Sequence, residues 1–298
     1  MKSCGFIVFG LCAGIVGCSN GGSTSDAGTD ASPVNDAGGA DVVSDAASGN
    51  DASDASTCGS CTGYTYCDTF ESYPAGPIAN AATLGPWTAT VTGTGAVMQI
   101  DTTNAYCGTK ALRITVPTNA GEDAGTAARG SLNQTATAGL IPGNDIFGRT
   151  MVYYSNVGGN DLPYNVHSWL FSSAGNSAAA DGGVNMNMGS NGAAPMMLLN
   201  YHPPAPLTEQ SVTGGSITAA AWHCVQWQYD GSGNPPNDTG AVWVDGTQVV
   251  TAAKSKGWNF ATPWSSFDFG FTHYEILANA VDVYLDDFAL SNTMVPCP

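Results

Sequence analysis

Basic residues are scarce in this 298-residue chain, which has seven lysines and arginines against 24 aspartates and glutamates and a formal net charge of −17. After residue 57, six basic residues remain. A nucleic-acid partner requires a basic patch that neutralises phosphates, so this composition argues against one.

A run of the roughly 20 apolar residues that a membrane-spanning helix needs is also missing. The longest apolar stretch, 5–16, follows a lysine and ends in Ile15-Val16-Gly17-Cys18. This pattern predicts a bacterial lipoprotein signal peptide at residues 1–18 with a lipid on Cys18. Ser19 resembles the residue that directs such proteins to an outer membrane. We therefore expect an exported protein, anchored by lipid at the outer membrane or cell surface; a plain secretory signal cleaved elsewhere is the alternative.

Residues 19–57 hold no basic or aromatic residue, and they combine seven aspartates with mostly Ala, Gly and Ser. Such a segment cannot bury enough apolar surface to fold, and its carboxylates repel one another. The sequence predicts a disordered acidic linker here. The remaining 241 residues, 58–298, are long enough for one large core and are expected to form a single, monomeric domain.

Six cysteines remain in that domain, because Cys4 and Cys12 leave with the signal. An even number in an exported domain predicts three disulfides, although six cysteines allow 15 pairings. We prefer Cys67 with Cys107, since both flank expected N-terminal strands. The Cys58-Gly-Ser-Cys61 spacing also fits redox or zinc motifs, but no βαβ pattern surrounds it, so a structural cystine is favoured.

The periodicity of the domain is two, and no amphipathic helix is evident. Strands rich in β-branched and aromatic residues are expected at 111–116, 149–154, 166–171, 222–229, 267–271 and 281–285. Asp245-Gly246 between two short strands predicts a hairpin with a type I′ turn. Many short strands with polar turns predict an all-β fold, a two-sheet jelly-roll sandwich.

A series of motifs resembles the concanavalin-like jelly-roll family related to glucuronan and other polysaccharide lyases, which includes a fungal cellulose-induced secreted protein. The resemblance covers about residues 67–290. It rests on Phe70-Glu71-Ser-Tyr73, Cys107-Gly-Thr-Lys-Ala-Leu-Arg-Ile114, Gly148-Arg149-Thr-Met-Val-Tyr-Tyr154, Val166-His167-Ser-Trp169, Trp222-His-Cys-Val-Gln-Trp-Gln-Tyr-Asp-Gly231, Val242-Trp-Val-Asp-Gly246 and Asp286-Asp287-Phe-Ala-Leu290. The resemblance implies a glycan site on a concave sheet, a structural calcium, and polysaccharide lyase activity.

Cleavage of a uronic-acid glycan by β-elimination needs a group that stabilises the developing charge, a base and an acid. Arg149 or Gln226 is the candidate for the first role and His167 for the base. Candidates for the acid are Tyr201, Tyr274 and His273. A packed histidine, ordinary sheet tyrosines and a surface ion pair of Arg149 are the competing interpretations. Gln226 also departs from the acidic residue found at that position in related sequences.

Glycoside hydrolysis is disfavoured, because the chain lacks the Glu-x-Asp-x-x-Glu pattern with which sandwich-type glucanases pair two carboxylates. The domain has only four glutamates, and no two of them are close in sequence.

Calcium is the expected cofactor, because the resemblance places an ion between the first and last strands. Hard oxygen donors that match those positions are Glu71, Asp101, Asn104, Asp286 and Asp287. A solvated strand end is the alternative explanation of the last two.

Two functional classes remain, each with a polysaccharide as partner. One is a surface-anchored lyase acting on a uronic-acid glycan, and the other is a non-catalytic carbohydrate-binding lipoprotein. The acidic composition speaks against a polyanionic substrate, whereas the ordered motifs speak for it. A structural or adhesive surface protein on the same fold is a third possibility.

Overall fold

The structure is a computed structural model that describes residues 61–118, 128–135, 140, 143–155, 167–175, 183–190, 195–203, 208, 210–215, 217–232, 237–260, 262–273 and 279–298. Within these ranges only the backbone is described for residues 128, 129, 134, 135, 167–175, 183–190, 195, 265 and 273. The expected signal peptide, the lipid-bearing cysteine and the linker lie outside the described residues and stay predictions.

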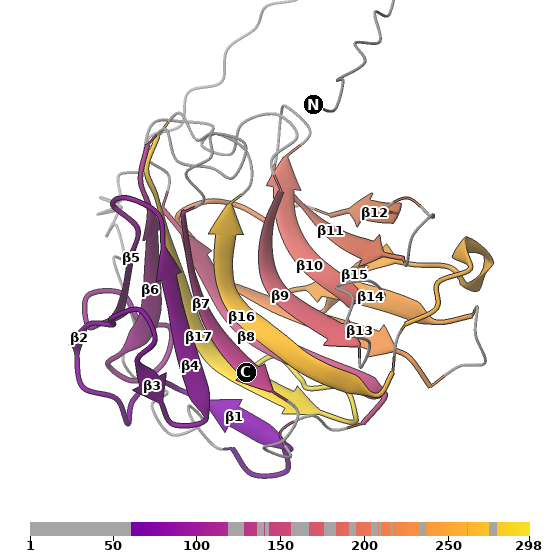
Figure 1. Cartoon of the computed structure of the whole chain (residues 1–298), viewed down its shortest axis with the longest axis horizontal. Coiled ribbons are helices and arrows are strands. Elements are labelled where there is room, and N and C mark those ends of the chain that lie inside the picture. The colour runs from indigo at the N-terminus through magenta and orange to yellow at the C-terminus, as the bar shows by residue number, and fades with distance from the viewer. Residues whose placement is uncertain are drawn as a thin grey trace, which may run out of the picture. The chain divides into compact units, whose positions relative to one another are not determined.

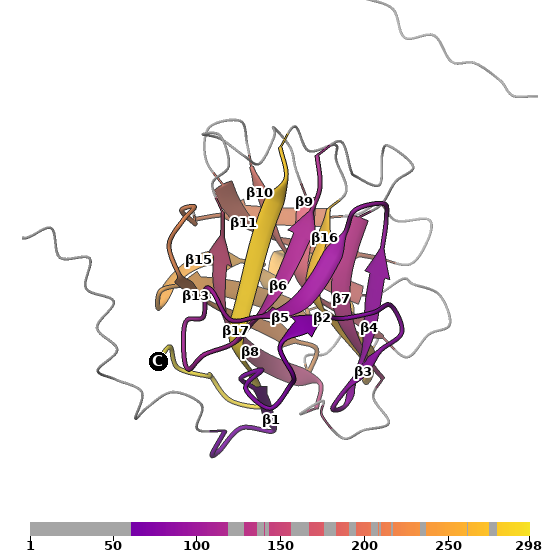
Figure 2. The same cartoon turned by 90° about the vertical axis from the view of Figure 1, so that its left-hand side faces the viewer.

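Two antiparallel sheets form the layers of a sandwich (Figures 1 and 2). Sheet I has nine strands: in spatial order β15 (Thr247–Thr251), β14 (Thr239–Val244), β13 (His223–Asp230), β8 (Asp145–Tyr154), β17 (Val281–Ser291), β6 (Ala111–Val116), β5 (Val97–Asp101) and β2 (Gly76–Pro77), with β1 (Tyr66–Asp68) also paired to β17.

Sheet II has eight strands: in spatial order β12 (Gln210–Gly214), β11 (Pro195–His202), β10 (Gly183–Ser190), β9 (His167–Gly175), β16 (Trp264–His273), β7 (Ala128–Thr135), β4 (Trp87–Thr92) and β3 (Thr83–Leu84). In the described part of the chain the only helix is the 3₁₀ turn η3 (Lys254–Lys256). None of the described helical residues forms a segment long and apolar enough to span a membrane. The all-β jelly-roll prediction is confirmed.

Alternation along the strands separates the core from the outer faces, as period-two patterns require. In β13, Val225, Trp227 and Tyr229 are fully buried between the sheets. Gly148 of the neighbouring β8 faces this cluster, and a Cβ there would lie only 2.1 Å from the Trp227 ring. A glycine is therefore required for the indole to fit.

The predicted hairpin joins β14 and β15 through Asp245 and Gly246. Both turn residues have positive φ, 49° and 76°, as a type I′ turn requires. The turn prediction is confirmed.

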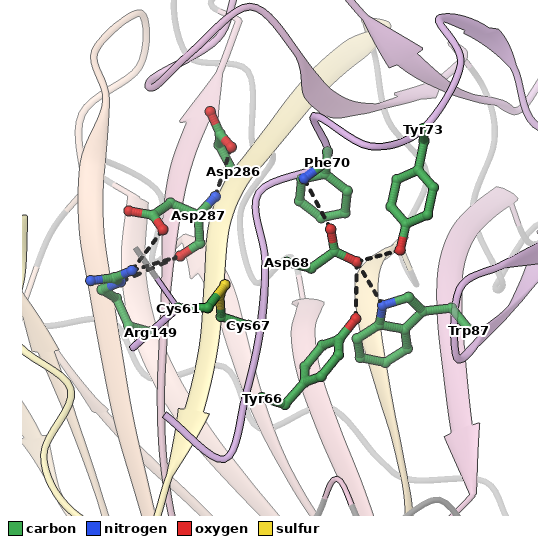
Figure 3. Close-up of a disulfide and its surroundings, with 10 residues drawn as sticks. All are labelled: Cys61, Tyr66, Cys67, Asp68, Phe70, Tyr73, Trp87, Arg149, Asp286 and Asp287. Carbon is green, nitrogen blue, oxygen red and sulfur yellow. Dashed lines mark hydrogen bonds and ion pairs between the residues drawn. A yellow bond between two sulfur atoms is a disulfide. The ribbon is translucent and has the colours of Figure 1, made fainter. Parts of the chain in front are cut away.

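Asp68, at the end of β1, connects the two sheets through a buried carboxylate (Figure 3). Its Oδ2 accepts hydrogen bonds from the hydroxyls of Tyr66 (3.0 Å) and Tyr73 (2.6 Å) and from Nε1 of Trp87 (3.1 Å), while Oδ1 accepts the Phe70 N–H (2.9 Å). Since β1 belongs to sheet I and Trp87 begins β4 of sheet II, one carboxylate joins both layers. Burial and the adjacent carboxylate raise the pKa of both tyrosines, which keeps them protonated as donors.

Disulfides secure the first and last segments of the domain. Cys61 bonds to Cys67 and Cys224 bonds to Cys297, with Cα separations of 5.5 and 5.9 Å. The expected Cys67–Cys107 pairing is wrong, because Cys67, the middle residue of β1, bonds to Cys61. Cys107 is itself disulfide-bonded.

Replacing Asp68 by Asn tests its role between the sheets. The asparagine amide has one acceptor oxygen where the carboxylate has two, and its NH₂ group would face the donors of Tyr66, Tyr73 and Trp87. Asp68→Asn is therefore expected to lower the free energy of unfolding by about 3 kcal/mol. The measurement is urea unfolding followed by tryptophan fluorescence. Tyr66→Phe, which removes one donor only, is the matched variant and is expected to cost about 1 kcal/mol. Equal losses in the two variants would contradict a central role of the carboxylate.

Candidate functional site

The residues expected to do chemistry fall on different parts of the sandwich. Arg149 and Gln226 pair in register on β8 and β13, and both face outward from sheet I. They are nonetheless 4% and 3% exposed, because the C-terminal segment covers them: Arg149 donates to the Pro296 carbonyl (2.9 Å) and Gln226 to the Val295 carbonyl (2.6 Å). Figures 1 and 2 both place the C-terminus near β1.

Arg149 also forms an ion pair with Asp287, with 2.7 Å between Nη2 and Oδ1 (Figure 3). Its guanidinium also donates to the Asp287 carbonyl and lies 5.5 Å from the centre of the Tyr64 ring. Arg149 thus joins β8, β17, the first described residues and the last ones. This is a structural arrangement in which the guanidinium is covered by the chain itself.

Tyr201 lies in the core. It is 2% exposed, packs against Trp258 and Phe260, and donates its hydroxyl to the Asn259 carbonyl at 2.6 Å. Burial raises the pKa of this hydroxyl. The position between the sheets keeps Tyr201 off both outer faces.

His167 is the first residue of β9 in sheet II, where its backbone pairs with Gly189. His273 ends β16 of the same sheet, and Tyr274 lies outside the described residues. The structure therefore places Arg149 and His167 in different sheets and does not bring them together.

The outward face of sheet II also carries polar side chains. In β4, β7, β16, β11 and β12 every second residue packs into the core, so the residues between them face outward. We call the outward set the polar face. Its described side chains are Thr88, Thr90, Thr92, Ser131, Asn133, Asp268, Thr272, Leu198, Asn200, Ser211 and Thr213.

One row of polar positions crosses seven of the eight strands of sheet II without interruption. The backbone register aligns, from β4 to β12, Thr88, Asn133, Asp268, Ser172, Asn185, Asn200 and Ser211. Neighbouring strands lie 4.7–4.9 Å apart, so the row spans roughly 29 Å. Hydrogen bonds link members of the face, including Ser211 to Asn200 (2.5 Å) and Thr90 to Asn133 (2.6 Å).

A second row runs parallel to the first. The register aligns Thr92, Arg129, Thr272, Trp169, Asn187, Leu198 and Thr213. This row brings Arg129, Thr272 and Trp169 to consecutive positions on three adjacent strands. His167 precedes Trp169 by two residues on β9.

Two hydroxyls of the polar face are buried without a hydrogen-bond partner in the described part of the chain. They are Ser131 Oγ, in a residue with no exposed surface, and Thr272 Oγ1, in a residue 3% exposed. Ser131 pairs in register with Gly270, and an irregularity in the β16–β9 pairing falls between Phe269 and Thr272. A Cβ on Gly270 of β16 would lie only 2.3 Å from the Gly130 carbonyl of β7, so these two strands approach closely here. β-Bulges of this kind often lie beside functional sites.

In the described part of the polar face, side chains on β4 and β12 are more exposed than those on β11. Thr88 and Thr92 on β4 and Ser211 and Thr213 on β12 are exposed, whereas Asn200 is 4% exposed. Buried hydroxyls without a partner are rare in folded proteins, and an ordered water or a ligand hydroxyl can supply the partner. The polar face therefore has the features of a ligand site for a hydroxyl-rich molecule.

Sequence reasoning missed this face, although a signal was present. The alternation of threonines at 88, 90 and 92 and of asparagines at 185 and 187 marks polar strand faces. Strand pairing, which decides that these faces lie side by side, joins segments far apart in the sequence.

Two of the five expected calcium ligands converge on the loop 106–110. Glu71 Oε1 accepts two of its N–H groups at 2.7 Å, and Asp286 Oδ2 accepts two others at 3.0 Å. The irregularity in β17 between Asp286 and Ala289 turns Asp286 toward this loop and Asp287 toward Arg149. Burial raises the pKa of Asp286 to about 7 although three N–H groups oppose the shift.

The other three expected ligands have different partners. Asp101 forms an ion pair with Arg113 at 3.4 Å, Asn104 accepts a hydrogen bond from Trp222 at 3.2 Å, and Asp287 binds Arg149. Among the residues that the structure describes, no three His, Cys, Asp or Glu side chains gather as a metal site. Glu71 and Asp286 are therefore the two expected ligands that contact the same loop, where each accepts backbone N–H groups.

No protein-family model and no curated protein sequence matches the chain. Solved structures do. The cellulose-induced protein Cip1 aligns with a TM-score of 0.54 at 17% identity, over 78% of this chain and 100% of its own. The alginate lyase vAL-1 from a Chlorella virus aligns with a TM-score of 0.50 at 13% identity, over 70% of this chain and 93% of its own. An endo-β-1,4-glucuronan lyase from the fungus Trichoderma reesei aligns with a TM-score of 0.47 at 15% identity, over 78% and 92%. The first two likenesses show a shared jelly-roll fold.

Proposed function

We propose that this chain is an exported, monomeric polysaccharide-binding protein whose glycan lies across the strands on the polar face of sheet II. The observation that carries the proposal is the polar row over seven strands, beside two buried hydroxyls without partners. Hydroxyl and amide side chains both donate and accept, which suits sugar hydroxyls. At roughly 29 Å, the row is long enough for an oligosaccharide.

The solved structures with the same fold support a carbohydrate as the ligand. One is named a cellulose-induced protein and another an alginate lyase. A fold by itself does not fix a function, so the polar face remains the main support.

Uronate cleavage by β-elimination is the second candidate function. Arg129, Thr272 and Trp169 occupy consecutive positions in the second row, and His167 is on the same strand as Trp169. In this mechanism Arg129, rather than the covered Arg149, would neutralise the substrate carboxylate, and His167 would remove the proton. Its signature is the ultraviolet absorbance of unsaturated uronate ends.

We further propose that the mature chain is held at the outer membrane or cell surface by lipid on Cys18, with residues 19–57 as a tether. Several acyl chains hold a protein stably in a membrane, whereas a single acyl chain binds only marginally. The tether would keep the polar face clear of the membrane.

Calcium is proposed as a structural ligand at the loop 106–110, held by Glu71, Asp286 and loop oxygens. The ion would offset the negative charge of Asp286, which is fully buried.

Removing the hydroxyls without partners tests the glycan site. Ser131→Ala and Thr272→Val are each expected to weaken glycan affinity by roughly 2–10-fold, since one hydrogen bond contributes about 0.5–1.5 kcal/mol. Unfolding free energy should stay unchanged or rise, because neither hydroxyl has a partner in the free protein. The measurements are calorimetric titration with polysaccharide fragments and urea unfolding.

Thr115→Val is the matched control, because its hydroxyl donates to Asp282 on the outer side of sheet I. It should cost stability and leave glycan affinity intact. Loss of stability without loss of affinity in the two sheet II variants would overturn the site.

The anchor is tested with Cys18→Ala. The variant is expected to appear in the soluble fraction and to lack the mass of a lipid, whereas the unmodified chain should sediment with membranes. Fractionation and mass spectrometry of the N-terminal peptide provide the readout. A Cys18→Ala chain that still sediments and carries lipid would rule out this attachment point.

Calcium binding is tested by chelation. Removing calcium is expected to lower the free energy of unfolding by about 2.7 kcal/mol if the ion is present at a hundredfold excess over its Kd. Glu71→Gln should abolish the chelator effect, while Asp230→Asn, which alters a carboxylate bonded to Ser232, should retain it. A melting temperature that chelator leaves unchanged in the unmodified chain would contradict the proposal.

A further inference from the structure

The positions of the basic and acidic residues narrow the class of glycan. We infer that the polysaccharide bound on the polar face is uncharged and is not a polyuronate. This inference rests on the proposed function and concerns the same site.

Five of the six lysines and arginines after residue 57 lie outside the strands of sheet II. Lys110 donates to the carbonyls of Glu71 and Tyr73 at 2.7 and 2.8 Å. Lys254 and Lys256 lie in η3, which connects β15 to β16.

Both arginines of sheet I are paired with carboxylates. Arg113 forms ion pairs with Asp101 and Asp282, at 3.4 and 2.8 Å, and Arg149 is covered as it binds Asp287. Arg129 of β7 is consequently the single lysine or arginine in the strands of sheet II, which also hold His167, His202 and His273.

A polyuronate carries a carboxylate on every sugar, so a chain laid along roughly 29 Å of the row would need several cations. The row offers neutral hydroxyls and amides instead, and β16, next to its central strand β9, contributes a carboxylate, Asp268. The domain as a whole is acidic, with 17 aspartates and glutamates against six lysines and arginines after residue 57. Like charges disfavour a polyanion both on approach and on contact.

An uncharged glycan needs no cations and is not repelled by the acidic side chains. Sugar hydroxyls donate and accept, as do the hydroxyls of Ser131 and Thr272, so each can satisfy the other without a net charge. Asn133 and Asn200 provide amides in the first row of the polar face. A carboxylate of Asp268 can accept from neutral hydroxyls but repels a uronate.

The test compares sugars that differ only at C6. The exported full-length chain is titrated with β-1,4-linked glucose and glucuronic acid oligosaccharides, and with β-1,4-linked mannose and mannuronic acid oligosaccharides, at low and high ionic strength. We expect the neutral member of a pair to bind at least about tenfold more tightly at low salt, and its affinity to be insensitive to salt.

Asp268→Asn adds a direct test of the charge argument. Removing this carboxylate is expected to narrow the ratio between neutral and uronate affinities by several fold at low salt. Asp230→Asn removes one negative charge from β13 of sheet I and should leave the ratio unchanged.

The possible results separate the inference from the function on which it rests. Equal or tighter uronate binding, or a ratio that Asp268→Asn leaves unchanged, overturns the inference while polysaccharide binding stands. A rise in ultraviolet absorbance with uronates that is lost in Arg129→Ala would also overturn the inference and would support β-elimination. Binding of neither sugar class, with no effect of Ser131→Ala, overturns the proposed function together with the inference.

Discussion

The buried carboxylate of Asp68 is the interaction on which the arrangement of both layers depends. It lacks an ion-pair partner among the described residues and instead accepts four hydrogen bonds, from Tyr66, Phe70, Tyr73 and Trp87. A buried charge of this kind is tolerated only when its oxygens are well satisfied. The donors come from β1, the segment after it and β4, so satisfying the carboxylate fixes the first strand of sheet I against an edge region of sheet II.

That constraint continues through β1 into the chain ends. β1 pairs with the last part of β17, Cys61 bonds to Cys67, and Cys224 bonds to Cys297. Arg149 and Gln226 then hold the C-terminal segment over the outer side of sheet I. One outer face is thereby used for closing the fold, and the other, over sheet II, carries the long polar rows. The covered position of Arg149 explains why its guanidinium serves structure, and the proposed ligand face lies on the other sheet.

The strands and turns could be predicted from the sequence where local properties of consecutive residues determine them. The Asp245-Gly246 hairpin follows from backbone sterics, and the separation of Val225 and Trp227 from Gln226 follows from period-two alternation. The candidate site could not be predicted in the same way. Arg149 and His167 both stand on strands, but strand order places them in sheets I and II, and no local property encodes that order.

The sequence by itself determined an all-β domain with few cations, outward polar positions on its strands and an even set of cysteines, because composition and alternation are local. Tertiary structure decided which outward positions share a face, that Cys67 pairs with Cys61, and that Arg149 is covered by the last residues. These depend on contacts between segments far apart in the chain. Their formation requires the whole core to assemble, since each polar group becomes buried or exposed only when the distant strands and chain ends are in place.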